Sequence, residues 1–277
     1  MKTYPLIEFL GKVTQQSGAE IGLAAHQLGS GREILIHPDL SFHPASTFKL
    51  CVMMEIFHQA RRGLFSLDDE MLVKNEFASI ADGSPYSLLA EDDSETDLYQ
   101  HIGRLLPIRE LVRRMITVSS NLATNILIER VTPARTTEFM RQLGADGLTV
   151  RRGVEDDKAF RLGMNNSATA RGFMQILIKL AKGKVVSLKD SDVMIEILSE
   201  QKFNQMIPAQ LSTDVRVAHK TGWTGTYHHD VGIVYPSKGN AFALAIMTNG
   251  FEKEEAHSFV ASLARKVYDE WIQRPNK

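Results

Sequence analysis

The sequence predicts an α+β fold in which a mainly helical lobe is inserted into a lobe built on an antiparallel sheet of about five strands. Strand-like segments lie near the two ends of the chain, and helical patterns fill the middle. Neither an internal repeat nor a low-complexity linker divides the 277 residues. We therefore assign 1–44 together with 206–277 to the sheet lobe and 45–205 to the mainly helical lobe, as parts of one structural domain.

The first strand pair is predicted over 20–37, where the sequence reads EIGLAAHQLGSGREILIH. Two short apolar segments flank Gly29-Ser30-Gly31, which is typical of a hairpin. Near the other end of the chain, VRVAHKTG, HDVGIVYP and AFALAIMTNG are strand-like and are separated by turns rich in glycine or by Pro-Ser-Lys-Gly-Asn. Together these segments predict one antiparallel sheet.

A C-terminal helix and a set of central helices complete the predicted fold. An apolar side chain recurs every four residues from Phe259 to Trp271, so one face of that helix can lie on the sheet. Several central helices have Ser, Thr or Pro near the first turn, as helix N-termini do. Their expected ranges are 45–60, 107–116, 119–131, 134–143, 168–182 and 190–201. The acid-rich stretch 91–97 lacks large apolar residues and is predicted to be a solvated loop.

The composition is close to that of an average globular protein and gives little support for nucleic-acid binding. Hydrophobic residues make up 43% and charged residues 23%, and 32 Lys plus Arg balance 33 Asp plus Glu. A chain with this balance has no global field that would gather nucleic acid or an anionic membrane. We therefore expect a small-molecule substrate rather than a nucleic-acid partner.

Cysteine content and the chain ends leave the cellular compartment open. Cys51 is the single cysteine, so the chain can form neither an intramolecular disulfide nor a cysteine cluster for a metal. The N-terminal segment 1–20 has an acidic residue within a short apolar run and no A-x-A cleavage pattern, unlike a signal peptide. No stretch is long enough to span a membrane. We expect a cytoplasmic protein, or a periplasmic or secreted one if an export signal was removed.

The first candidate catalytic motif is Ser46-Thr-Phe-Lys49, at the start of the helix predicted over 45–60. Residues three apart lie on one helix face, so the two side chains can touch. The helix is apolar nearly all round from Phe48 to Met54, which indicates that it is buried and that Lys49 is desolvated. Because burial lowers the pKa of a lysine, Lys49 could act as a base near neutral pH and activate Ser46 as a nucleophile.

The S-x-x-K pattern is weak evidence when it stands alone, because average composition yields about one match by chance in a chain of this size. Ser199-Glu-Gln-Lys202 is a second match, on a polar helix end where no catalytic role is expected. The competing interpretation of the first match is that Ser46 is only a helix N-cap and that Lys49 extends to solvent.

The second motif, Ser119-Ser120-Asn121, opens the helical run NLATNILIERV. A serine at this junction could relay a proton to a leaving group, and an asparagine amide could hold a substrate amide. The alternative interpretation is a pair of helix caps, which Ser and Asn commonly provide.

The third motif, Lys220-Thr221-Gly222, ends the strand-like run VRVAH. A strand that ends in these residues presents a cation, a hydroxyl and a bare backbone edge to a groove. Such an edge suits a carboxylate and an extended substrate. The alternative is an ordinary strand end followed by a turn.

The motifs S-x-x-K, S-x-N and K-T-G occur in this order and on these elements in the class A β-lactamases and related penicillin-recognising serine enzymes, which the chain resembles. The flanking segments MITVSSNLATNIL, HKTG and HDVGIVYP are also similar to the family's, and the likeness covers nearly the whole chain. The resemblance implies a three-layer α/β/α fold of the DD-peptidase and β-lactamase type. In that fold terminal helices flank the sheet, and the site lies in the cleft between the sheet and an all-helical lobe.

The resemblance also implies a role for each motif residue. Ser46 would attack a strained lactam or amide carbonyl, with Lys49 as the candidate base and Ser119 as the proton shuttle. The backbone amides of Ser46 and Trp223 would form the oxyanion hole, whose donors are worth on the order of 3 kcal/mol each. The residues expected to bind substrate are Asn121, Lys220, Thr221, Gly222 and Trp223.

Two positions depart from the family pattern. Ser120 stands where the family usually has Asp, and it brings no charge. In the loop VRRGVEDDKAFRLGMNNSATA, Glu155 follows Arg152 at the distance expected of the deacylating glutamate, but Ala159 replaces the expected Asn and the loop is shorter than usual. Glu155 is therefore either the base that activates water or one member of the acidic surface run 155–157.

These features predict a monomeric serine hydrolase, similar to a β-lactamase, that acts without a cofactor through an acyl-enzyme at Ser46. Its substrate would be a small β-lactam, peptide or ester. The alternatives are a penicillin-binding DD-peptidase or esterase-like hydrolase, and a sensor that acylates slowly and keeps the adduct. No G-x-S-x-G occurs, which disfavours a lipase-type α/β-hydrolase. His228-His229-Asp230 lacks the helical spacing of zincins, so we expect no metal and place it on a strand beside the cleft.

Overall fold

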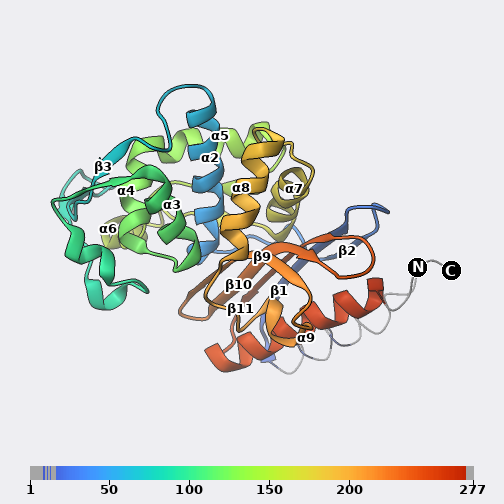
Figure 1. Cartoon of the computed structure of the whole chain (residues 1–277). Helices are drawn as coiled ribbons and strands as arrows, with labels where there is room; N and C mark the ends of the chain where they lie inside the picture. Colours follow the sequence, from blue (N-terminus) through green and yellow to red (C-terminus); the bar gives the residue numbers. More distant parts are fainter. Residues whose placement is uncertain (1–8, 10, 12, 14–16, 273–277) are drawn as a thin grey trace.

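The computed structural model describes residues 9, 11, 13 and 17–272 and has the predicted α+β architecture (Figure 1). Its sheet is five-stranded, with the strand order β2-β1-β11-β10-β9. The hairpin near the N-terminus joins the C-terminal strands because β1 pairs antiparallel with β11. The strands are β1 (Glu20–Gln27), β2 (Glu33–Ile36), β9 (Arg216–Thr224), β10 (Tyr227–Tyr235) and β11 (Phe242–Asn249).

Each face of the sheet is covered by helices and carries its own hydrophobic core. Helix α9 (Lys253–Ile272) lies along one face (Figure 1), where its predicted apolar stripe from Phe259 to Trp271 packs on Leu244 and other sheet residues. The predicted N-terminal helix lies mostly outside the described residues, although the Phe9 ring stacks on Phe259. Among the described helices, none combines the length and the apolar character needed to cross a bilayer.

The other face of the sheet meets the central helices, which agree with the predicted ranges to within a few residues, except that the five-residue α6 was not predicted. Helix α2 runs through the middle of this lobe (Figure 1), and ten of its thirteen residues are buried. A Ser or Thr side chain caps four of these helices, namely α4, α5, α7 and α8. The helices are α2 (Lys49–Arg61), α3 (Ile108–Thr117), α4 (Asn121–Val131), α5 (Pro133–Gln142), α6 (Asp157–Arg161), α7 (Ala170–Ala181) and α8 (Leu188–Ser199).

Most short elements escaped the sequence-based prediction because two to five residues are too few to show alternation or helical periodicity. Three small ribbons pair β3 with β6, β4 with β5 and β7 with β8. Their bounds are β3 (Glu70–Leu72), β4 (Phe77–Ala78), β5 (Pro85–Tyr86), β6 (Leu105–Pro107), β7 (Leu148–Thr149) and β8 (Ser167–Ala168). The 3-10 helices are η1 (Ala45–Phe48), η2 (Ala90–Asp92), η3 (Asp97–His101) and η4 (Ile207–Gln210). The lobe boundaries after residues 44 and 205 stay predictions.

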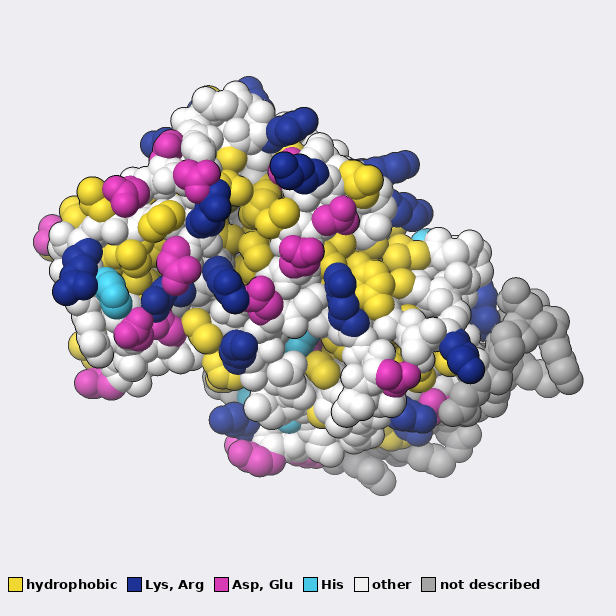
Figure 2. All heavy atoms as spheres, viewed as in Figure 1, with side chains coloured by type: hydrophobic (Ala, Val, Ile, Leu, Met, Phe, Trp, Pro, Cys, Tyr) yellow, Lys and Arg dark blue, Asp and Glu magenta, His cyan; other side chains and the backbone are white. Residues whose placement is uncertain are grey.

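The prediction that 91–97 is a solvated loop is wrong at its centre. Asp93 is only 7% exposed, and its carboxylate accepts hydrogen bonds from the backbone N–H groups of Asn121 and Leu122. A helix N-terminus has unpaired N–H donors, and a carboxylate can satisfy them even where no apolar residue anchors the loop. On the face seen in Figure 2, acidic and basic side chains are interspersed, in keeping with the balanced composition.

Candidate active site

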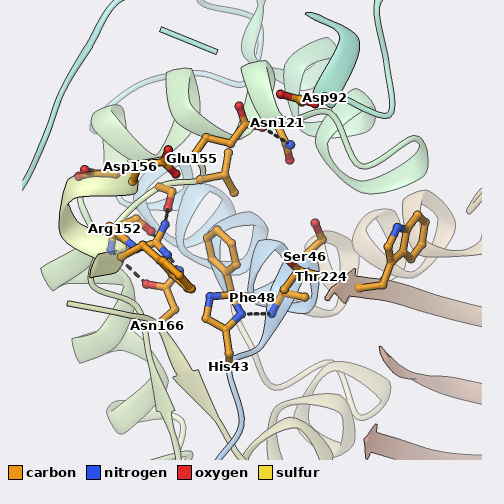
Figure 3. Close-up of a pocket in the computed structure, with 16 residues that line it drawn as sticks. His43, Ser46, Phe48, Asp92, Asn121, Arg152, Glu155, Asp156, Asn166 and Thr224 are labelled. Atoms are coloured by element: carbon orange, nitrogen blue, oxygen red, sulfur yellow. Dashed lines mark hydrogen bonds between the residues drawn. The ribbon is translucent and has the colours of Figure 1, made fainter. Parts of the chain in front are cut away.

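A cavity of about 420 Å³ opens where η1, the end of β9, the start of α4 and residues 152–157 meet (Figure 3). Four of the predicted site residues line it, namely Ser46, Asn121, Glu155 and Trp223. The sequence analysis did not assign the other lining residues to the site. They include His43, Phe48, Asp92, Arg152, Asp156, Phe160, Asn166 and Thr224.

Ser46 lies in the 3-10 turn η1 rather than in the first turn of an α-helix. The turn is held by the backbone, because the Lys49 N–H donates to the carbonyl oxygens of Ser46 and Thr47. Ala45 has a φ of +46°, a left-handed conformation that is uncommon for a residue with a side chain. The neighbours of Ser46 are buried while Ser46 itself is partly exposed, so the turn presents its hydroxyl group to the cavity (Figure 3).

Gly222 allows the edge strand β9 to lie directly against η1. A Cβ atom at this position would be 2.7 Å from the backbone nitrogens of Ser46 and Thr47, closer than real Cβ contacts occur. Any side chain at this position would therefore push the strand away from the turn. The two amides expected to form the oxyanion hole, those of Ser46 and Trp223, belong to these two segments.

Lys49 is fully buried and is hydrogen-bonded to the start of α4. Its Nζ donates to Ser119 O at 2.6 Å and to Asn121 Oδ1 at 2.8 Å, with a longer bond to Ser119 Oγ at 3.3 Å. No hydrogen bond joins Lys49 Nζ to Ser46 Oγ, although the sequence spacing predicts that the side chains can touch. The interpretation that Lys49 extends to solvent is wrong.

Burial lowers the pKa of Lys49 to about 7, and the negative charges of Asp93 and Glu155 act in the opposite direction. A lysine with this pKa is substantially neutral at physiological pH and can accept a proton. Burial also raises the pKa of Glu155, while the hydrogen bond from Asn121 partly offsets that rise. Strongly perturbed titratable groups beside a cavity are typical of catalytic sites.

Ser119 Oγ lies between two buried lysines. Lys220 Nζ donates to it at 3.0 Å, and Lys49 Nζ lies at 3.3 Å. Burial and the nearby Lys49 lower the pKa of Lys220 well below its ordinary value. A hydroxyl oxygen that accepts from two amines keeps its own O–H free to donate elsewhere. Ser119 has a φ of +59°, so the site holds it in a strained conformation.

The strand residues after Lys220 place one free polar group beside it. Thr221 is buried, and its Oγ1 has no hydrogen-bond partner among the described residues. A buried hydroxyl without a partner is costly unless a ligand or solvent satisfies it. Trp223 is partly buried, and its ring packs edge-to-face against Phe203 at a centroid distance of 5.0 Å.

Asn121 connects the two titratable groups of the site. Its Oδ1 accepts from Lys49 Nζ, and its Nδ2 donates to Glu155 Oε1 at 2.7 Å. Figure 3 shows Asn121 and Glu155 on the same side of the cavity, facing Ser46. Glu155 is half-buried and has a φ of +58°, another strained position at the cavity wall.

In the acidic run 155–157, Asp157 lies on the surface as predicted, Asp156 does not, and the two interpretations of Glu155 stay predictions. Asp156 is 2% exposed, and its carboxylate accepts from Ser79 Oγ at 2.7 Å, Ile80 N at 2.9 Å and Ala159 N at 3.1 Å. It therefore ties the loop to a neighbouring segment and caps α6. The Asp157 side chain is 79% exposed. Ala159, which replaces the expected Asn, is fully buried.

The His228–Asp230 run lies on β10, as predicted. His229 Nε2 donates to the carbonyl oxygen of His43 at 2.8 Å, and Asp230 is paired with His219 at 2.8 Å. Within the described ranges, no three His, Cys, Asp or Glu side chains come together in an arrangement that could hold a metal ion.

Residues missed by the sequence analysis brace the base of the Glu155 loop. Arg152 donates to Gly153 O and to Asn165 Oδ1, and Asn166 Oδ1 accepts from the Arg152 backbone N–H. The Phe160 ring lies near the Arg152 guanidinium. The adjacent Asn165 and Asn166 are the sequence feature that could have revealed these contacts, because asparagine side chains can close a loop by hydrogen bonding to its backbone.

Comparison with known proteins identifies the family. A family profile described as "Beta-lactamase enzyme family" matches residues 5–271, which is most of the chain. The chain belongs to the β-lactamase enzyme family. This assignment confirms the predicted resemblance, and the five-stranded sheet with its covering helices is the fold of that family.

Matching proteins are distant from this chain in sequence, and the solved structures among them are similar to it in fold. The β-lactamase of Streptomyces albus G is 25% identical over 264 residues, covering 92% of this chain and 81% of that protein. The β-lactamase structure from Sphaerobacter thermophilus superposes with a TM-score of 0.83 at 19% identity, covering 99% and 100% of the two chains. A mutant of PBP-A, solved as an acyl-enzyme complex with penicillin G, gives a TM-score of 0.80 at 23% identity over 96% and 95%.

Proposed function

We propose that this member of the β-lactamase family opens β-lactam rings through an acyl-enzyme formed at Ser46. The observation that carries the proposal is the position of Ser119 Oγ, between the buried Lys49 and Lys220 and two residues before Asn121, which lines the cavity where Ser46 is exposed. This arrangement provides a nucleophile, a base with a lowered pKa and a hydroxyl proton donor in one place.

Acylation begins when neutral Lys49 takes the proton of Ser46 Oγ as that oxygen attacks the lactam carbonyl carbon. For this step Lys49 exchanges one of its hydrogen bonds to the α4 junction for one to Ser46, since catalytic hydrogen bonds tighten in the substrate complex. The Ser119 hydroxyl then donates its proton to the lactam nitrogen as the C–N bond breaks. Protonated Lys49 returns a proton to Ser119 Oγ, which leaves an ester at Ser46.

The substrate carboxylate is held by Lys220 and Thr221, which lie within β9 rather than at the predicted strand end, because the strand continues to Thr224. The unpartnered Oγ1 of Thr221 is free to donate. A bound carboxylate is an opposite charge that favours protonated Lys220, so Lys220 supplies positive charge beside Thr221 when substrate is present. Charge-assisted hydrogen bonds are roughly twice as strong as neutral ones, so a carboxylate gains more here than a neutral ester does.

Deacylation uses Glu155 as the base for a water molecule. Its pKa is raised by burial, which makes the carboxylate a stronger base than an exposed one. Glu155 takes a proton from the water, the water oxygen attacks the ester carbonyl, and the proton returns to Ser46 Oγ as that bond breaks. Asn121 fixes one carboxylate oxygen and leaves the other available to the water.

A second candidate is a slow acylator of the DD-peptidase, esterase or sensor type, which one observation favours. The position expected to hold an Asn partner for the water is Ala159, a buried methyl group. With one polar partner fewer, the water is less well positioned and the ester lives longer. We therefore expect turnover of β-lactams that is measurable but modest.

An intact-mass time course with penicillin G tests the proposal. The wild-type chain should gain the mass of the opened lactam and lose it again, and Ser46→Ala should never gain it. Ser199→Ala is the matched control, because Ser199 belongs to the other S-x-x-K match and its hydroxyl is bonded to Ile195 O. An adduct that persists in Ser46→Ala, or that maps to Ser119, would refute the assignment.

A further inference from the structure

The α3–α4 junction, which carries Ser119 and Asn121, is held by a segment outside the three motifs. The Asp93 carboxylate accepts the Asn121 backbone N–H through both oxygens at 2.9 Å and the Leu122 N–H at 2.9 Å. The Ser94 hydroxyl donates to Val118 O at 2.8 Å and lies 3.3 Å from Ser119 O. We call Asp93 and Ser94 the 93–94 clamp.

The 93–94 clamp acts on the backbone where strain is stored. Ser119 has a left-handed φ, a strained conformation that persists only when its surroundings enforce it. Ser94 bonds the carbonyl groups before and at this residue, and Asp93 bonds the N–H groups that follow it. The clamp thus fixes the junction from both sides of Ser119.

The clamp is itself anchored to α3. Glu95 Oε1 accepts from Arg114 Nη1 at 2.8 Å, and Tyr99 Oη donates to Asp93 Oδ2 at 3.1 Å. Arg114 is held independently by Glu110, one turn earlier in α3. The segment that bears Asp93 is therefore fixed to the helix that leads into the junction.

The clamp also brings a charge that the second motif lacks. Ser120 is fully buried and caps α4 through a neutral hydroxyl bond to Ala123 N, so the 119–121 motif carries no charge of its own. Asp93 places a carboxylate at the same helix N-terminus, where a negative charge is stabilised by the helix dipole. Lys49, which bonds Ser119 O, lies within range of that charge.

We propose that Asp93 is a positioning residue of the reaction, whose carboxylate comes from a separate loop, fixes Ser119 and Asn121 and supplies the charge that the 119–121 motif lacks. The inference rests on the proposed function of Ser46 and goes beyond it. Although Ser120 is neutral, the Asp93 carboxylate keeps a negative charge near the buried Lys49.

The central test is Asp93→Asn, measured as the rate of acylation by a chromogenic cephalosporin against pH. In Asp93→Asn the side-chain NH₂ would replace one of the two oxygens that accept from the α4 N–H groups. Two donors would then face each other, so the α3–α4 junction should shift. We expect acylation to slow ~10- to 10²-fold, the loss that a misplacement of about 1 Å can cause. The variant should stay folded, as checked by circular dichroism.

The pH profile distinguishes positioning from simple loss of structure. The charged groups that face Lys49 are Asp93, Glu155 on its loop and Lys220 on β9. Removing the negative charge of Asp93 lowers the pKa of Lys49, so the acid limb of the acylation profile should move to lower pH. Asp93→Glu keeps the charge and should leave that limb in place.

Asp97→Asn is the matched control for the loss of one carboxylate. Its exposed side chain bonds Arg114, which keeps Glu95 and Glu110 as partners, so neither the rate nor the profile should change. Ser94→Ala removes only the carbonyl bonds and should slow acylation without moving the acid limb. This variant keeps the inference testable if Asp93→Asn does not fold.

Ser120→Asp gives a reciprocal test. Added to the wild-type chain, it places a second carboxylate at the α4 N-terminus and should slow acylation, whereas in Asp93→Asn it should restore part of the lost rate. If Asp93→Asn leaves the rate and the acid limb unchanged, or if Ser120→Asp harms both backgrounds equally, the inference is wrong. If instead the proposed function is wrong, the wild-type chain itself will form no adduct at Ser46, which distinguishes that failure from a failure of the Asp93 inference.

Discussion

The catalytic lysine of the cavity wall formed by η1, β9 and the start of α4 is more tightly bonded than Glu155, which lies in the adjoining wall formed by residues 152–166. In the first wall, the buried amines of Lys49 and Lys220 each make at least two hydrogen bonds. In the second, Glu155 is half-buried and bonded through one carboxylate oxygen, and the nearby Phe160 is 54% exposed. Groups held in place by several hydrogen bonds are better preorganised for a reaction than groups held by one. The comparison therefore predicts fast formation of the acyl-enzyme and slower hydrolysis.

Among these variants, Lys49→Met should lower the acylation rate the most. It removes the base and the hydrogen bonds to the α4 junction, so acylation should fall within the ~10²- to 10⁴-fold range of a positioned base. In the wild-type chain, acylation should rise as the pH increases through about 7, because only neutral Lys49 accepts the serine proton. Single-turnover rates measured at several pH values provide the check.

Lys202→Met is the control for Lys49→Met, since Lys202 is the exposed lysine of the other S-x-x-K match. It should acylate like the wild-type chain. A wild-type rate that is flat across this pH range would show that another group accepts the proton.

Glu155→Gln should slow only the step assigned to the 152–166 wall, which is hydrolysis of the acyl-enzyme. Acylation should stay near the wild-type rate while release of the adduct slows ~10²- to 10³-fold, because a neutral amide cannot take the proton of the water. Mixing with penicillin G should then show a stoichiometric burst in place of steady turnover. Asp157→Asn removes an exposed charge from the same loop and should retain steady turnover. Equal behaviour of the two variants would remove Glu155 from the mechanism.

Lys220→Ala should discriminate between substrates. Hydrogen bonds to charged groups contribute about 1.5–3 kcal/mol, so kcat/KM for a carboxylate-bearing lactam should fall ~10- to 10²-fold further than kcat/KM for its neutral ester. The ratio isolates the carboxylate, since both substrates also lose the bond from Lys220 to Ser119. Losses of the same size for acid and ester would mean that the substrate carboxylate binds elsewhere.

The smallest expected effect is on the free energy of unfolding, through contacts of the wall formed by residues 152–166. Asp156→Asn should lower the free energy of unfolding by about 1–3 kcal/mol, because one oxygen that accepts a buried hydrogen bond becomes a donor. Asp157→Asn should leave it unchanged within about 0.5 kcal/mol. Urea titrations of both variants provide the measurement, and equal midpoints would mean that the Asp156 contacts do not stabilise the loop.

The sheet, the central helices and the three motifs were predictable because each depends on local pattern. The apolar stripe from Phe259 to Trp271 specifies one helix face, and the buried run after Phe48 implies a desolvated Lys49. Asp93 and Asp156 were not predictable in the same way. Their hydrogen-bond donors lie on segments far away in the chain, and an acid-rich stretch has the same local pattern whether it is solvated or caps a helix.

The contact of Gly222 with the Ser46 turn joins segments from opposite ends of the chain. Likewise, Ser119 meets Lys49 across 70 residues and Lys220 across 101. Such contacts have high sequence separation, and closing the long loops between them costs entropy before any contact forms. Helices α2 and α4 can gain structure locally, but the site cannot exist until β9 docks. Acylation at Ser46 during refolding therefore reports completion of the whole fold, later than the helical circular dichroism signal.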